Sequence, residues 1–327
     1  MRILVTGATG FLGGATARRL AELGHEVVGT GRDPEAGARL AERGIHFVPA
    51  ELGDRESIFG LCEGMEWVVH SAALSSPWGP WETFFEANVT GTRHVAMGCL
   101  LAGVKRLVHI STPGIYANGK NRLDLSEEAS LFRPLNHYVA TKRLAEAAVL
   151  EAGAAGLEVV ILRPRGIIGP GDQTIVPRIL RALEAGRLPV VGGRSVLADM
   201  TVIDNAVHAI ECALVAPVAG RIFNITGGEP VPLWDLVDDL CRRLDLTPPS
   251  RKLSYRLAWF LAGQLERWHR LFPSRGEPVL TRYGVCLIGR SLTLDISAAR
   301  RDLGYDPQVS IREGVERFVA WWKERER

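Results

Sequence analysis

The segment "VTGATGFLGG" at residues 5–14 decides the fold. It places Gly7, Gly10 and Gly13 between the apolar run "RILVTG" and a segment of helical periodicity that begins near Phe11. In a turn from strand to helix, one glycine permits the tight turn, a second lets the backbone approach a pyrophosphate, and a third lets the helix pack on the strand. The helix N-terminus attracts the phosphate charge. The spacing therefore predicts a dinucleotide-binding site.

Short β-branched runs alternate with helical patterns through the first half of the chain. The expected strands are "RILVTG", "HEVVGTG", "IHFVPA", "MEWVVHSA", "KRLVHIST" and "LEVVILRP", and the expected helices lie near residues 11–23, 34–43, 55–63 and 81–103 and around Tyr138. This alternation predicts an α/β fold with a Rossmann-type, doubly wound parallel sheet. The expected domains are a dinucleotide-binding domain (1–165 plus about 196–228) and a smaller, discontinuous C-terminal substrate domain (about 166–195 plus 229–327).

Composition excludes several classes of protein. Of the 327 residues 46% are hydrophobic and 23% charged, and 39 Lys and Arg nearly balance 37 Asp and Glu, which gives no basic surface for nucleic acid. Five cysteines, odd in number and never paired as C-x-x-C, predict neither disulfides nor a metal site. No window predicts a membrane-spanning segment, and "MRILVTGATG" leaves no room for a signal peptide, so we expect the cytoplasm.

The end of the second expected strand predicts the type of dinucleotide. An NAD enzyme usually places an acid there to accept hydrogen bonds from the adenosine ribose, whereas an Arg suits the additional 2′-phosphate of NADP. Here Gly31 holds the place of the acid and Arg32 follows it. The prediction is NADP(H) in preference to NAD(H). Glu51 and Leu52, after the third strand, would border the adenine by their position.

The segment "NHYVATKRLAE" at residues 136–146 places Tyr138 and Lys142 four residues apart on one face of a helix. Hydride transfer to a carbonyl carbon requires a proton donor at the oxygen, and the reverse reaction requires a base. A phenol with a pKa of about 10 exchanges protons poorly near neutral pH, but a nearby ammonium favours the phenolate. Tyr138 is therefore predicted as the acid or base, and Lys142 as the group that assists it.

Together these motifs resemble those of the extended short-chain dehydrogenases/reductases. The resemblance also rests on "HSAA" (70–73), "ANVTGT", "ISTPGIY" (110–116) and "LRPRGIIGPGD" (162–172). It implies that Thr112, with Ser111 beside it, supplies a hydroxyl to the reacting oxygen, that Asn88 supports the site, and that Lys142 also binds the nicotinamide ribose. The cofactor contacts it implies, with those predicted above, are Gly7, Thr9, Gly10, Phe11, Leu12, Gly13, Arg32, Glu51, Leu52, Ser71, Ala72, Ala73, Tyr138, Lys142, Arg163 and Pro164.

Departures from the family pattern reduce the number of reactions that the sequence is compatible with. Pro113-Gly114 stands where the sugar-nucleotide dehydratases carry an Asp-Glu pair, which argues against dehydration. "STPGIY" resembles the 3β-hydroxysteroid dehydrogenase-like branch, and residues 169–195 resemble bacterial reductases of olefin biosynthesis that reduce a long-chain 2-alkyl-3-oxoalkanoate with NADPH. Sterol or 3β-hydroxysteroid dehydrogenation and nucleotide-sugar epimerisation stay open as alternatives. A non-catalytic dinucleotide sensor is the alternative from a different class, although such proteins commonly lose the Tyr or the Lys.

Two aromatic segments indicate a bulky apolar substrate. "LSSPWGPW" (74–81) carries Trp78 and Trp81 in a loop at the carboxyl end of the fourth strand, where doubly wound folds bind ligands. Residues 253–272 form an amphipathic pattern that fits a helix packed on its own domain, a substrate lid, or a surface for a membrane or a partner enzyme. The predicted substrate contacts are Ser75, Trp78, Pro113, Arg165 and Trp268, and the candidate carboxylate ligands are Arg165, Arg178 and Arg194.

The resemblance also implies a quaternary structure. In the family, the helices that correspond to residues 84–103 and 138–153 usually form a four-helix dimer interface. The small residues of "AEAAVLEAGAAG" would allow close approach of a second copy. A homodimer is therefore expected.

Overall fold

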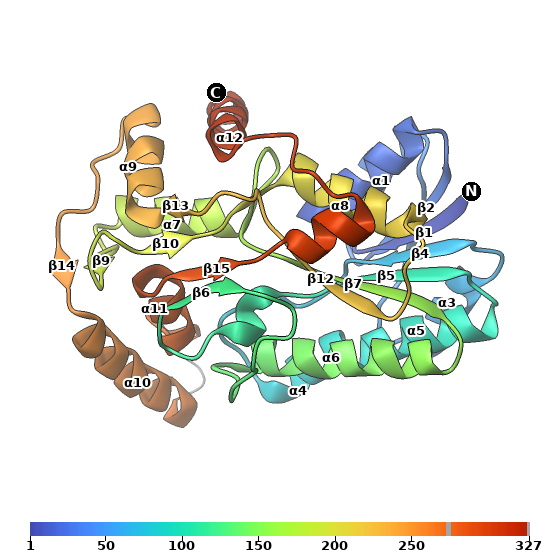
Figure 1. Ribbon diagram of the computed structural model, residues 1–327, viewed down its shortest axis with the longest axis horizontal. Helices are drawn as coiled ribbons and strands as arrows, with labels where there is room; N and C mark the ends of the chain where they lie inside the picture. Colours follow the sequence, from blue (N-terminus) through green and yellow to red (C-terminus); the bar gives the residue numbers. More distant parts are fainter. Residues whose placement is uncertain (273–275, 326–327) are drawn as a thin grey trace.

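The computed structural model describes residues 1–272 and 276–325, and its centre is a seven-stranded parallel sheet (Figure 1). The strands run in the order β12-β7-β5-β4-β1-β2-β3. Their bounds are β1 (Arg2–Thr6), β2 (Glu26–Gly31), β3 (His46–Pro49), β4 (Trp67–His70), β5 (Arg106–Ile110), β7 (Glu158–Pro164) and β12 (Arg221–Ile225). The strand order reverses between β1 and β4, which is where such sheets bind ligands. The predicted doubly wound fold is confirmed.

Helices cover both faces of this sheet, as Figure 1 shows. One face carries α3 (Arg55–Cys62), α5 (Gly91–Leu101) and α6 (His137–Ala154), and the other carries α1 (Phe11–Glu22), α2 (Pro34–Ala41) and α8 (Ile203–Val215). Successive residues of a strand point to opposite faces. Accordingly Ile3 and Val5 pack under α1 and α8, whereas Leu4 packs under α3 and α5.

The remaining elements form a smaller unit beside the carboxyl ends of the large sheet (Figure 1). Its four-stranded sheet joins β13 (Val231–Pro232), β10 (Leu197–Ala198), β15 (Leu292–Leu294) and β6 (Arg122–Leu125), and two further pairs join β11 (Thr201–Val202) with β8 (Ile167–Ile168) and β14 (Lys252–Leu253) with β9 (Val190–Val191). Its helices are α7 (Ile175–Glu184), α9 (Leu233–Arg243), α10 (Tyr255–Leu271), α11 (Arg282–Gly289) and α12 (Ile311–Arg325).

Three short strands from the predicted dinucleotide-binding domain, β6, β10 and β11, pair with strands of the smaller unit. β6 and β10 were assigned by sequence to the dinucleotide-binding domain, but both pair in the smaller sheet, on either side of β15. These strands are so short that their hydrophobic pattern does not indicate the sheet in which they pair. The division into two domains otherwise stays a proposal, and residues 273–275 and 326–327 of the predicted C-terminal segment lie outside the described residues.

Within the described ranges, no helix is both long enough and apolar enough to cross a bilayer.

Candidate active site

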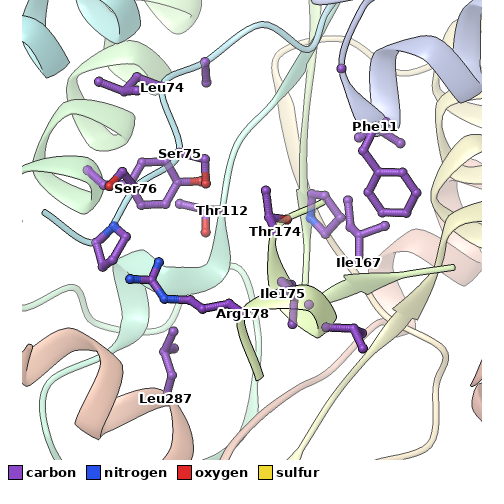
Figure 2. A pocket seen from close by; sticks show the side chains of 18 of the residues that line it. Phe11, Leu74, Ser75, Ser76, Thr112, Ile167, Thr174, Ile175, Arg178 and Leu287 are labelled. Atoms are coloured by element: carbon purple, nitrogen blue, oxygen red, sulfur yellow. The ribbon is translucent and has the colours of Figure 1, made fainter. Parts of the chain in front are cut away.

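A cavity of about 1150 Å³ lies at the carboxyl ends of the central strands, between the two units (Figure 2). One side is formed by the glycine turn after β1 and by the segments that follow β2, β3, β4 and β5. The opposite side is formed by α7, α9 and α11 of the smaller unit. In Figure 2, Ser75 and Thr112 lie on one wall and Phe11 and Ile167 on another, and the side chain of Arg178 lies below Thr112, between it and Leu287. The cavity therefore joins the expected dinucleotide site to the expected substrate site.

The turn after β1 fits a bound pyrophosphate. Gly7 has a φ of +70°, and a Cβ on this residue would lie 2.9 Å from the backbone of Ala72. A Cβ on Gly13 would lie 2.3 Å from the carbonyl oxygen of Gly7, so only glycine lets α1 pack this closely on the turn. The N-cap of α1 is Gly10, which offers no side chain to cap the first turn. The backbone N–H groups of that turn face the cavity and can bind an anion.

Tyr138 and Thr112 lie together on the wall of the cavity beneath the loop after β4. Thr112 precedes the 3₁₀-helix η2 (Pro113–Tyr116), and its hydroxyl accepts a hydrogen bond of 3.1 Å from the N–H of Gly114. Burial raises the pKa of Tyr138, while hydrogen bonds with Ser75 and Thr112 oppose the rise. The phenol is therefore protonated near neutral pH and can donate a proton.

Lys142 is almost completely buried below Tyr138 on α6. Its ammonium donates to the carbonyl oxygen of Ile110 at 2.6 Å and lies 3.3 Å from Nε2 of His109. Burial lowers its pKa to about 8, and the charge of Glu146 only partly opposes that change. Two of its three hydrogens have partners in the protein, and the third is available to a ligand in the cavity. The predicted role of Lys142 in assisting Tyr138 stays a prediction.

Two buried histidines lie under the site in neighbouring strands. His70 of β4 and His109 of β5 are in register, with ring centres 5.1 Å apart. Burial, followed by the charge of Lys142, lowers the pKa of His70 to about 3 and places that of His109 well below its ordinary value. Both rings are therefore neutral, and His109 can accept a hydrogen bond from Lys142.

The hydrogen bonds of His70 fix its tautomer. The hydroxyl of Thr92 donates to the carbonyl of Asn88 at 2.6 Å, so it must accept from Nε2–H of His70 at 2.9 Å. Nδ1 of His70 then accepts from the hydroxyl of Thr6 at 2.7 Å, and this hydroxyl in turn accepts from the N–H of Ala72 at 3.2 Å. This chain of bonds holds the "HSAA" segment against the first strand and the helices beside it.

Asn88 holds the next part of the same loop. It lies in the π-helical segment η1 (Glu86–Thr90), which follows α4 (Trp81–Phe85). Its amide accepts from the N–H of Leu74 at 2.7 Å and donates to the carbonyl of Leu74 at 3.1 Å and to the hydroxyl of Thr141 at 3.0 Å. It does not line the cavity. Asn88 therefore positions the loop that carries Ser75, and its predicted supporting role stays a prediction.

Ser111 and Arg163 belong to a buried polar cluster below the site. Glu146 of α6 pairs with the guanidinium of Arg163 at 2.7 Å and 2.8 Å and accepts from the hydroxyl of Ser111 at 2.5 Å. Arg163 also donates to the hydroxyl of Tyr116. Its prediction as a cofactor ligand is corrected by the structure, because these partners occupy its donors and keep it out of the cavity. Since Ser111 is bonded to Glu146, Thr112 is the better placed of the two hydroxyls.

The comparisons with known proteins agree with this geometry. Residues 3–226 match the family described as the NAD dependent epimerase/dehydratase family. The chain belongs to that family. It is 37% identical over 330 residues to a 2-alkyl-3-oxoalkanoate reductase of Stenotrophomonas maltophilia (strain K279a), with 98% of this chain and 99% of the relative covered. It is 34% identical over 291 residues to the 3beta-hydroxysteroid-dehydrogenase/decarboxylase isoform 1 of Arabidopsis thaliana, with 84% and 66% covered.

A solved structure shares the whole fold. The dTDP-glucose 4,6-dehydratase DesIV from Streptomyces venezuelae, with NAD and TYD bound, superposes with a TM-score of 0.80 at 26% identity, covering 99% of this chain and 97% of that one. The resemblance to the extended short-chain dehydrogenases/reductases, and to their 3β-hydroxysteroid dehydrogenase-like branch, is thereby confirmed. The protein is an oxidoreductase of this type, and its cofactor is a nicotinamide dinucleotide.

Most residues predicted from the sequence of this family member line the cavity. They are Gly7, Thr9, Gly10, Phe11, Leu12, Gly13, Arg32, Glu51, Leu52, Ser71, Ala72, Ala73, Ser75, Ser111, Thr112, Pro113, Tyr138, Lys142, Pro164, Arg165 and Arg178. They come from both units of the fold, and their individual roles stay predictions.

The structure does not bring three other predicted residues to the cavity. Trp78 packs against α10, where the guanidinium of Arg270 lies 5.7 Å from its ring centre. Trp268 lies on the outer side of α10 with its ring centre 4.5 Å from that of Phe272. No residue of α10 lines the cavity, and the lid interpretation of this helix stays untested. Arg194 forms an ion pair with Asp238 away from the cavity.

Sequence reasoning missed Tyr283 and His109. Tyr283 of α11 is buried at the cavity, and a Cβ on Gly114 would lie 2.6 Å from its hydroxyl. Burial, with the nearby Tyr138 as the next cause, raises its pKa. No spacing in the sequence connects Tyr283 with the Tyr138 motif, because the two are brought together only by the packing of α11. His109 could have been found from its alignment beside His70 in adjacent parallel strands.

Proposed function

We propose that this enzyme reduces the 3-oxo group of a long-chain 2-alkyl-3-oxoalkanoate to the 3-hydroxy acid with NADPH. The proposal rests on the environment of Arg165. Its side chain is 9% exposed and lines the cavity, and among the described residues its Nε–H has no hydrogen-bond partner. A buried guanidinium with an unused donor is stabilised by an anionic ligand, and a carboxylate matches its planar geometry.

Arg165 lies in the same part of the cavity as the reacting groups. Its charge acts on Tyr283 and on Asp199, and Tyr283 is in turn close enough to Tyr138 for the two to interact. Burial raises the pKa of Asp199 to about 6, so this carboxyl is mostly ionised at pH 7 and its charge acts on Arg165, but the Nε–H of Arg165 still has no hydrogen-bond partner in the described part of the chain. A substrate with a carboxylate on Arg165 would present its neighbouring oxo group toward Tyr138.

The walls beyond Arg165 suit alkyl chains. The apolar side chains that line this part of the cavity are Ile167, Ile168, Ile175, Val176, Ile179, Leu188, Met200, Leu233, Leu236, Val237, Leu240, Leu280, Leu287, Ile288, Val315 and Phe318. A sugar nucleotide would leave many hydroxyls without partners against these side chains, which is costly. The lining therefore favours an alkyl-substituted acid over the epimerase alternative.

The chain's own residues perform the proton chemistry. When bound, the nicotinamide supplies the hydride that adds to the carbonyl carbon. Tyr138 donates its hydroxyl proton to the carbonyl oxygen, which becomes the alcohol, and Thr112 holds that oxygen with a hydrogen bond. Lys142 lies one turn along α6, where its charge stabilises the phenolate that remains on Tyr138. The glycine turn would hold the pyrophosphate.

Gly31 and Arg32 support NADPH as the reductant. A Cβ on residue 31 would lie 2.5 Å from Oγ1 of Thr9, so an acidic side chain at this position requires Thr9 to move. Arg32 lines the cavity and forms no ion pair with the described residues. Its guanidinium is available to a 2′-phosphate.

The test is NADPH oxidation by the purified enzyme with four substrates: a long-chain 2-alkyl-3-oxo acid, its methyl ester, a 3-oxosteroid and a UDP-sugar. We expect the acid to be preferred. Tyr138→Phe should abolish turnover and retain nucleotide binding. Arg165→Gln should lower kcat/KM for the acid roughly 10- to 100-fold, as expected for a charge-assisted hydrogen bond, and leave that for the ester unchanged. Turnover of the steroid or the UDP-sugar alone would refute the substrate assignment.

A 3β-hydroxysteroid is the second candidate, because the apolar walls and the Arabidopsis relative's name are compatible with it. In that case Arg165→Gln would not change kcat/KM. Residence in the cytoplasm stays a prediction.

We also propose a homodimer. Its support is the exposed apolar residues of the adjacent helices α5 and α6, namely Met97, Leu101, Leu144 and Leu150. A monomeric mass in solution at micromolar concentration would contradict it.

A further inference from the structure

Helix α10 presents a large apolar surface to the outside of the molecule. It lies at the edge of the smaller unit, beyond α11, as Figure 1 shows. Its inner face is made of the buried residues Ala258, Ala262 and Glu266. Its outer face carries Leu257 (47% exposed), Phe260 (60%), Leu261 (40%), Trp268 (46%) and Leu271 (74%). At 3.6 residues per turn these five positions form a stripe within an arc of about 100°, which also contains the exposed polar residue Gln264 between Leu261 and Trp268.

The charges beside this stripe are basic. Residues 251–272 contain five basic residues and one acid, a net charge of +4, whereas the whole chain has a net charge of +2. The acid is Glu266, which is buried and paired with Arg282 at 3.3 Å. The exposed charges of the segment are therefore all positive: Arg251, Lys252, Arg256, Arg267 and Arg270. On the helix, Arg256, Arg267 and Arg270 form a row along one side of the apolar stripe.

The stripe lies near the cavity. At its C-terminal end α10 packs on Trp78 through His269 and Arg270, and the loop of Trp78 contributes Ser75, Ser76 and Pro77 to the cavity wall. After α10, Val279 is 74% exposed and also lines the cavity. The C-terminal end of α10 therefore lies next to a loop that forms part of the cavity wall.

We propose that α10 is a docking surface for an anionic lipid membrane. A helix with an exposed apolar face and basic residues beside it lies in the plane of the bilayer, with its apolar side chains among the acyl chains and its basic groups at the lipid phosphates. A second copy of the chain fits this surface less well. In a twofold contact the same surface of each copy meets, and the basic rows would repel each other.

The proposal extends the proposed function, and its catalytic consequence rests on that function. A long-chain acid partitions into the bilayer, and docking through α10 would bring the cavity to the membrane where the substrate is concentrated. Docking itself depends only on α10 and does not require the reductase assignment.

The test is flotation of the full-length enzyme with vesicles of phosphatidylcholine alone or mixed with phosphatidylglycerol. We expect flotation with the mixed vesicles only, and less of it at high salt. Phe260→Glu/Leu271→Glu should abolish flotation. Arg256→Gln/Arg267→Gln should lower the partition coefficient roughly 30-fold, since each basic residue near an anionic surface contributes about 1 kcal/mol.

Leu123→Glu/Val215→Glu is the matched control, because Leu123 (54% exposed) and Val215 (70% exposed) lie on other elements. This variant should float like the wild type. Equal flotation of the Phe260→Glu/Leu271→Glu variant, or none of the wild type, would overturn the proposal. Concentration-dependent self-association of the wild type, lost in that variant without any vesicle binding, would assign the surface to a second copy instead.

Activity separates this proposal from the proposed function. The Phe260→Glu/Leu271→Glu variant should reduce a short-chain, water-soluble 3-oxo acid at the wild-type rate but lose the rate enhancement that mixed vesicles give with a long-chain acid. Flotation without any reductase activity would leave docking supported and remove the proposed function. Reductase activity without flotation would leave the proposed function supported and overturn the docking proposal.

Discussion

Replacing Lys142 with Met should stabilise the nucleotide-free protein at pH 7 and abolish its reductase activity. Lys142 is 2% exposed, and burial lowers its pKa from 10.5 to about 8. This difference corresponds to about 3 kcal/mol of unfavourable free energy for the charged form in the folded protein. Met has a similar shape and no charge. The variant also loses the hydrogen bonds to Ile110 and His109, at about 1 kcal/mol for a typical bond. The expected net gain in stability is about 1–2 kcal/mol.

The pH dependence of this gain identifies its cause. Because the folded-state pKa lies below the unfolded-state value, the unfolded chain binds more protons between about pH 8 and 10.5. The stability of the wild type relative to the variant must therefore rise with pH across that range, while below pH 8 the full penalty is present.

The assay is urea unfolding of both proteins, stripped of nucleotide, at pH 7 and pH 10. Subtracting the two free energies of unfolding at each pH removes the titration of all other groups. The variant should be more stable at pH 7, and its advantage should shrink or reverse at pH 10. A variant that is less stable at pH 7, or a difference that does not change with pH, would refute the reasoning.

Two further predictions concern other buried and cavity-lining groups. In urea unfolding, Glu146→Gln should lower the free energy of unfolding by about 3–5 kcal/mol, because it leaves the buried Arg163 without its counter-charge. The control is Glu158→Gln, which breaks an ion pair whose carboxylate is 54% exposed and should lower the free energy of unfolding by about 1 kcal/mol or less. In fluorescence titrations, Arg32→Ala should weaken NADPH binding roughly 10- to 100-fold and leave NADH binding unchanged. The control Arg39→Ala, on the exposed side of α2, should change the binding of neither nucleotide. Equal losses of affinity for both nucleotides in the Arg32 variant would contradict a contact with the 2′-phosphate.

The sequence predicted the large sheet well because its strands are buried on both faces and read as continuous apolar runs between helical patterns. The glycine turn was equally predictable, because a Cβ at Gly7 or Gly13 would clash with backbone atoms, so that these positions require glycine. The smaller unit was less predictable. Strands of two residues such as β10 leave no periodic pattern, and β6 joins a sheet whose other members lie far along the chain.

Predictions for single side chains failed where tertiary packing decides the direction in which the side chain points. Arg163 and Arg165 are two residues apart, and both were candidates for ligand contacts. Arg163 lies within β7, where Glu146 on the helix covering that face pairs with it, whereas Arg165 lies just past the end of the strand, at the cavity. Likewise the Trp78 ring packs against Arg270 and His269 of α10. No spacing in the sequence predicts this contact.

The burial of Lys142 has a consequence for the direction of the reaction. In the nucleotide-free protein its charge has little compensation, because the carboxylate of Glu146 is already bonded to Arg163 and Ser111. Tyr138, one turn away, is held as a neutral phenol by its own burial. In the proposed reaction Tyr138 gives up its proton during reduction, and the phenolate would form one helical turn from the ammonium, where opposite charges in a poorly solvated site attract each other strongly. An interaction that is weak in the resting enzyme and strong as the proton leaves lowers the barrier instead of merely tightening binding. In the proposed reaction the same buried charge that destabilises the fold would favour proton donation by Tyr138, which is why Lys142→Met should gain stability and lose turnover together.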